Sequence, residues 1–73
     1  MMTRAQGLTI WAAARERARD DLFAKAVRLS RQGLAQEAGR CRSAARILQV
    51  RAAHERAQAA ARASARAFTL ARL

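Results

Sequence analysis

Few side chains in this sequence could carry out catalysis or hold a metal ion. Cys41 and His54 are the only cysteine and histidine, and the five acidic residues are scattered along the chain. Because a structural zinc ion takes four ligands, and because no glycine-rich phosphate loop is present, we expect no metal site, no cofactor and no enzymatic activity. We interpret Cys41 as a small core residue and His54 as a residue of a helix surface or an interface. A single thiol fits a reducing compartment, which predicts a cytoplasmic protein.

Arginine is the abundant residue type with binding chemistry of its own. Fourteen arginines and Lys25 are balanced by only five acidic residues, so the net charge is +10, with +3 over residues 1–37 and +7 over residues 38–73. Such a charge predicts an anionic partner, which is a nucleic acid, an anionic membrane surface or an acidic protein. Arginines at helical spacing would line up with phosphates, and four of them fall on one side of the second predicted helix: Arg40, Arg51, Arg62 and Arg66.

An arginine-rich helical DNA- or RNA-binding protein is therefore the alternative function. Two features of the sequence weigh against it. No short helix-turn-helix with a compact recognition helix is apparent, and only three aromatic residues are available to stack on bases.

The composition predicts an all-α protein without a membrane span. The chain has no proline and three glycines, and it is rich in alanine, arginine, leucine, glutamine and glutamate, which all favour helices. The longest uncharged stretch, residues 5–14, is half of the roughly 20 residues that a spanning helix needs. A single small domain is therefore expected.

The clearest local signal is a turn at Gly33. If Gly33 follows a helix end, Leu29 and Leu34 occupy the two positions that make the hydrophobic contact of a Schellman motif. Arg28 and Arg31 then lie in the last helical turn, where they complement the helix dipole. The alternative is one long helix that tolerates Gly33.

These signals predict an antiparallel helical hairpin. Residues 1–8 form an N-terminal segment, residues 9–32 the first helix with Thr9 as its N-cap, and residues 34–71 the second helix; a three-helix chain with a break near residues 53–55 is the alternative. Apolar residues at helical spacing are expected to form the hairpin core: Leu8, Trp11, Ala18, Leu22, Ala26, Leu29, Leu34, Ala38, Cys41, Ala45, Leu48 and Ala52.

Two arginines, Arg15 and Arg19, project into the apolar stripe of the first helix. In a hairpin that turns at Gly33, Glu55 lies near Arg15. We expect these two residues to form an ion pair, because an unpaired and dehydrated arginine would be costly.

The second helix is longer than the first, and its C-terminal half carries a second apolar stripe. A chain of this size rarely gains enough stability from its own core, so a second subunit is expected to cover that stripe. The alternative is a monomer whose C-terminal tail frays. The predicted homodimer interface consists of Val50, Ala53, Ala57, Ala61, Ser64, Phe68 and Ala71.

Protein binding is the function that the sequence favours. Tryptophan and arginine are the residue types most enriched at binding hot spots, although Trp11 could instead close the open end of the core. The predicted partner is a protein with an acidic surface, bound by residues chosen from Trp11, Arg15, Arg19, Arg40, Arg51, Arg62 and Arg66.

Two resemblances accompany this interpretation. Residues 22–48 resemble a single tetratricopeptide repeat, but Lys25 and Arg42 depart from its pattern, and one repeat implies only a helix-turn-helix. In size and composition the chain is also similar to small phage or mobile-element proteins that bind and inhibit host proteins. That likeness implies a regulator or inhibitor that covers part of its target, and it assigns no site residues.

Overall fold

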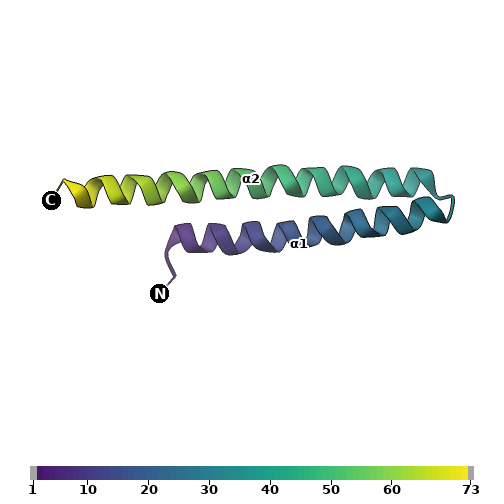
Figure 1. Cartoon of the computed structure of the whole chain (residues 1–73), viewed down its shortest axis with the longest axis horizontal. Coiled ribbons are helices and arrows are strands. Elements are labelled where there is room, and N and C mark those ends of the chain that lie inside the picture. The colour runs from purple at the N-terminus through teal and green to yellow at the C-terminus, as the bar shows by residue number, and fades with distance from the viewer. Residues whose placement is uncertain (1, 73) are drawn as a thin grey trace.

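A computed structural model describes residues 2–72, which form two long helices joined by a tight turn. Helix α1 spans Arg4–Arg31 and helix α2 spans Ala35–Ala71. The two helices run antiparallel and side by side along a rod of 62 × 20 × 11 Å (Figure 1). The predicted all-α hairpin is confirmed. Within residues 2–72, neither helix has a stretch long and apolar enough to cross a membrane.

The turn has the geometry predicted for Gly33. Its φ angle is 79°, a left-handed conformation that glycine adopts without steric cost. The Leu34 N–H donates to the Leu29 carbonyl at 2.9 Å, and the Gly33 N–H donates to the Ser30 carbonyl at 3.0 Å, which are the two hydrogen bonds of a Schellman motif. The single-helix alternative is therefore wrong. The three-helix alternative is wrong as well, because α2 continues through residues 53–55.

Helix α1 begins earlier than the sequence interpretation placed it. Thr3 is the N-cap: its hydroxyl accepts from the Gln6 N–H at 3.1 Å, and the Gln6 side chain accepts from the Thr3 N–H at 2.8 Å. This reciprocal capping box needs Glu or Gln three residues after the cap. Thr9 has alanine at that position, so the prediction of Thr9 as N-cap was wrong. Its hydroxyl donates to the Ala5 carbonyl within the helix instead.

The core is a narrow seam between the helices, built mainly from alanine. On α2 the buried alanines recur every seven residues, which is the repeat of a coiled-coil seam. Their small side chains let the two backbones approach closely. No large side chain among residues 2–72 is fully buried. The buried apolar residues are Leu8, Ala12, Ala26, Ala38, Ala45, Ala52 and Ala59.

Three residues predicted for the core are exposed: Trp11, Ala18 and Leu34. On α1 the seam advances from Leu8 in steps of four and three, so Trp11 and Ala18 each lie one residue before a seam position and point to the side. Leu34 lies in the turn, where its side chain is exposed. The other predicted core residues are buried or half-buried. The α1 seam runs through Leu8, Ala12, Arg15, Arg19, Leu22, Ala26 and Leu29.

Candidate interaction surfaces

One ion pair lies inside the seam between the helices. The Arg15 Nε donates to the Glu55 Oε1 at 2.6 Å, and the two side chains are 34% and 11% exposed. The predicted Arg15–Glu55 pair is confirmed. Because a buried carboxylate needs a partner, this contact also selects the register in which Glu55 meets Arg15.

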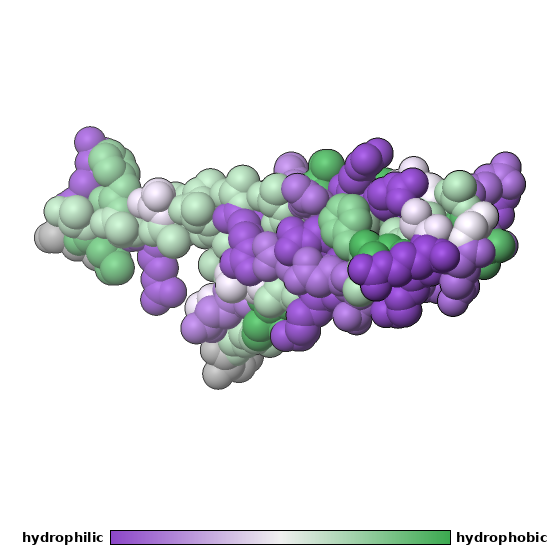
Figure 2. All heavy atoms as spheres, turned by 45° about the vertical axis from the view of Figure 1, so that its right-hand side comes forward, coloured by the Kyte–Doolittle hydropathy of each residue, from purple (hydrophilic) through white to green (hydrophobic). Residues whose placement is uncertain are grey.

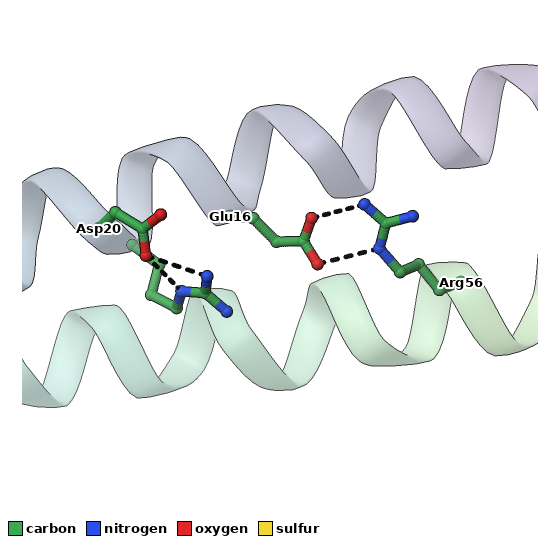
Figure 3. A network of polar contacts seen from close by, with 4 residues as sticks. Glu16, Asp20 and Arg56 are labelled. Carbon is green, nitrogen blue, oxygen red and sulfur yellow. Dashed lines mark hydrogen bonds and ion pairs between the residues drawn. The ribbon is translucent and has the colours of Figure 1, made fainter.

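A second ion pair flanks the first on the surface. Arg56 donates to both carboxylate oxygens of Glu16, from Nε at 2.9 Å and from Nη2 at 2.5 Å (Figure 3). These hydrogen bonds lower the pKa of Glu16 and raise that of Arg56. The sequence interpretation missed this pair. Its signal was available, since Glu16 and Arg56 each directly follow a member of the predicted Arg15–Glu55 pair.

Two of the arginines predicted to bind a partner are engaged within the chain. Arg15 binds Glu55 in the seam. Arg19 is half-buried at the seam and pairs with its neighbour Asp20 at 2.9 Å (Figure 3). The other four candidate arginines are exposed and lack an ion-pair partner among residues 2–72. They are Arg40, Arg51, Arg62 and Arg66.

Trp11 projects from the side of α1. It is 62% exposed and borders a shallow hollow of about 300 Å³ with Ala14 and Arg15. The alternative in which Trp11 closes the open end of the core is therefore wrong. An exposed tryptophan on a rigid helix is the kind of side chain that dominates binding energy at protein interfaces.

The outer face of α2, which points away from α1, is apolar and uncovered. Val50 is 69% exposed and Phe68 62% exposed, and Ile47 is exposed beside them. All seven residues predicted for a dimer interface are exposed in the single chain. Six of them follow a seven-residue repeat that also includes residues 47 and 54. The outer face comprises Ile47, Val50, His54, Ala57, Ala61, Ser64, Phe68 and Ala71, with Ala53 beside it.

No charged residue belongs to this outer face between positions 53 and 71, and the Arg72 guanidinium that follows lies over the Phe68 ring, 4.8 Å from its centroid. At about 100° per residue, the four charged residues between positions 53 and 71 fall on an arc of about 120° on the side toward α1. Figure 2 shows the projecting end of α2 as a largely apolar surface, whereas the paired part of the hairpin presents many hydrophilic side chains. The four charged residues are Glu55, Arg56, Arg62 and Arg66.

The open end of the hairpin contains the largest hollow described here, a groove of about 670 Å³. It lies between the first turn of α1 and the C-terminal part of α2. Arg4, Arg62 and Arg66 line it together with Leu70 and neighbouring alanines. None of the three arginines has a carboxylate of residues 2–72 within ion-pair distance.

Among residues 2–72, no three histidine, cysteine or acidic side chains gather closely enough to hold a metal ion. Cys41 is a half-buried free thiol on the seam side of α2. The exposed His54 hydrogen-bonds the Gln58 amide one turn along the same helix at 3.0 Å. Comparison with known proteins identifies no protein family, no curated protein and no solved structure that matches this chain.

Proposed function

We propose that this protein is a small basic homodimer that binds an acidic surface of another protein and regulates or inhibits that protein by covering the surface. The observation that carries the proposal is the location of the large apolar side chains. The buried apolar residues are Leu8 and six alanines, whereas Trp11, Val50 and Phe68 are more than half exposed. Contiguous exposed apolar patches, such as the outer face of α2, mark sites where other molecules bind.

The outer face of α2 supports the homodimer. Its repeat uses the same seven-residue spacing as the seam that already joins α1 to α2, and it combines alanines and Ser64 with the larger Ile47, Val50 and Phe68. A second copy is a suitable cover for it, because a twofold interface places one patch against itself and no charged residue belongs to this patch between positions 53 and 71. The small alanine core gives a further reason, since so short a chain gains stability when a second subunit buries more apolar surface.

Charge supports an acidic target. Ion pairs within residues 2–72 engage only Arg15, Arg19 and Arg56 of the fourteen arginines. The others give the rod a positive potential that attracts a negatively charged surface and speeds association with it. Trp11 adds a large apolar contact on the side of α1, and binding there would occlude the covered part of the target.

The homodimer is tested by solution mass. The double variant Phe68→Asp/Ala61→Asp places two charges on the outer face. It is expected to be a folded hairpin with the mass of a monomer, whereas the wild type is expected to have the mass of a dimer. The matched control Ala24→Asp/Val27→Asp places two charges on exposed positions of α1 and is expected to keep the wild-type mass. Circular dichroism verifies that both variants are helical. A double variant that retains the dimer mass contradicts this interface.

The nature of the target is tested with a labelled random DNA duplex at about 50 and 200 mM salt. Binding by contact with phosphates weakens steeply with salt. Duplex binding that is weak and vanishes by 200 mM supports a protein target. Tight duplex binding that persists at 200 mM overturns the proposal in favour of the nucleic-acid function, which the many unpaired arginines would then explain.

A further inference from the structure

The seam that joins the two helices continues along α2 beyond the N-terminus of α1. From the buried Ala59, the next seam positions along α2 are Arg62 and Arg66, in steps of three and four. Helix α1 has 28 residues and α2 has 37. The nine additional residues of α2 correspond to about 14 Å of helix. Over this length the inner face of α2 has no helix packed against it.

The covered part of the seam indicates which groups a bound partner would place opposite Arg62 and Arg66. Both arginines in the covered seam meet a carboxylate: Arg15 meets Glu55 of the opposite helix at 2.6 Å, and Arg19 meets Asp20 of its own helix at 2.9 Å. Arg62 and Arg66 occupy seam positions one turn apart, and Arg4 joins them in lining the groove. No carboxylate of residues 2–72 reaches any of the three. An occupant with carboxylates at these positions would complete the pattern.

The other walls of the groove distinguish a peptide from a nucleic acid. Ala63, Ala67 and Leu70 contribute an apolar floor, and neither tryptophan nor phenylalanine lines the groove. At the start of α1, the side-chain oxygens of Thr3 and Gln6 each accept a backbone N–H in the capping box. A sugar-phosphate backbone would leave the apolar floor uncovered and find no aromatic ring for its bases. A peptide with both carboxylates and an apolar side chain fits all walls.

We propose that the groove at the open end of the hairpin binds an acidic, leucine-containing segment of the partner protein, with carboxylates on Arg4, Arg62 and Arg66 and an apolar side chain on Leu70. This inference rests on the proposed function, and it assigns the acidic partner to one site. The segment lies along the exposed length of α2 as a continuation of α1, so two to three helical turns fill it.

The experiment measures binding of a fluorescein-labelled 14-residue peptide by fluorescence anisotropy at about 150 mM salt. The peptide carries glutamates one helical turn apart on one side and leucines beside them. We expect the wild type to bind it, and Arg62→Gln/Arg66→Gln to weaken binding at least tenfold. The matched control Arg42→Gln/Arg46→Gln removes the same charge at the same spacing from exposed positions of α2 outside the groove. It is expected to change the affinity by less than about threefold.

Two further probes test the chemistry of the segment. A peptide with glutamine for every glutamate is expected not to bind, and Leu70→Ala is expected to weaken binding of the glutamate peptide several-fold. Equal losses in the two arginine double variants would overturn the groove and leave a general acidic-partner function standing. Absence of peptide binding to the wild type also overturns the groove. A single-stranded oligonucleotide that displaces the bound peptide at equal concentration, together with tight duplex binding at 200 mM salt, would overturn the proposed function itself.

Discussion

The inner and outer faces of α2 use the same spacing for different purposes. On the inner face Ala38, Ala45, Ala52 and Ala59 recur every seven residues and are buried against α1. On the outer face the same spacing recurs between positions 47 and 71, but every one of its residues is exposed. One face closes the hairpin, and the other presents its apolar side chains to solvent.

The two faces also treat charge and bulk in opposite ways. The inner face includes a charged residue, Glu55, because Arg15 on α1 supplies the opposite charge. The outer face has no charged residue between positions 53 and 71, and the Arg72 guanidinium lies over Phe68 at its C-terminal end. The face includes Val50 and Phe68, which are larger than any fully buried side chain. Small residues and the Arg15–Glu55 ion pair are thus enough to join the two helices of one chain. The larger apolar side chains are available for contacts between molecules.

The largest effect on folding is expected when two single variants are compared, each with an aspartate on one of the two faces. Ala52→Asp puts a charge at a position that is 1% exposed, one turn from Glu55, and burial of an unpaired charge costs at least about 3 kcal/mol. The hairpin is expected to unfold, as a loss of helical circular dichroism. Ala57→Asp on the outer face is expected to leave the helical signal in place and to lower the solution mass. Similar helical loss in both variants would contradict the distinction between the faces.

The sequence predicts the fold more fully than the details of the seam. The Gly33 turn depends on a local pattern, a glycine with one leucine four residues before it and another directly after it. The Arg15–Glu55 pair follows from the position of the turn by counting residues. Trp11 was assigned to the core because large apolar residues usually lie there. The strict steps of four and three place arginines at seam positions instead. A geometric repeat was therefore a better guide to this alanine-rich seam than hydrophobicity.

The surfaces were predictable to a different degree. The arginines at positions 62 and 66 were among the binding candidates, but the groove they line depends on where α1 begins. That start follows from the Thr3–Gln6 capping box, which the interpretation of Thr9 as N-cap overlooked. The homodimer stays a prediction, because the cover of the outer face belongs to a second chain.

The next largest effect is expected from breaking the ion pair on the inner face. Glu55→Gln leaves the guanidinium of Arg15 without its counterion in a partly dehydrated seam, and a hydrogen bond between charged groups contributes about 1.5–3 kcal/mol. Because Arg15 is one-third exposed, the loss in free energy of unfolding is expected near the lower end, at about 1.5 kcal/mol. A double-mutant cycle with Arg15→Gln measures the coupling. Purely additive losses would show that the contact does not stabilise the fold.

An effect of similar size is expected at the turn that sets the inner face against α1. Gly33→Ala forces alanine into a left-handed conformation with φ near 79°, at a cost of about 1–2 kcal/mol. Gly39→Ala is the matched control within α2, where the added methyl group meets only the end of the Arg42 side chain at 4.0 Å. Alanine there is expected to stabilise the helix by up to about 1 kcal/mol. Thermal unfolding of both variants gives the signs, and a neutral or stabilising Gly33→Ala would contradict the turn.

The smallest effect is expected at the exposed edge of the inner face, where Arg56 binds Glu16. The hydrogen bonds from Arg56 hold the pKa of Glu16 below its ordinary value of 4.5. A carboxyl group whose pKa is lower in the folded than in the unfolded chain stabilises the fold above the unfolded pKa. That contribution is present at neutral pH and is lost as the pH falls through the folded pKa. An NMR titration of Glu16 is expected to give a pKa below 4.5 in the wild type and a higher one in Arg56→Gln.

Because the Glu16–Arg56 pair is open to solvent, its stabilisation is also expected to weaken with added salt, whereas the Arg15–Glu55 coupling in the seam is expected to change less. Equal salt dependence of the two pairs would show that the seam does not shield its ion pair from water.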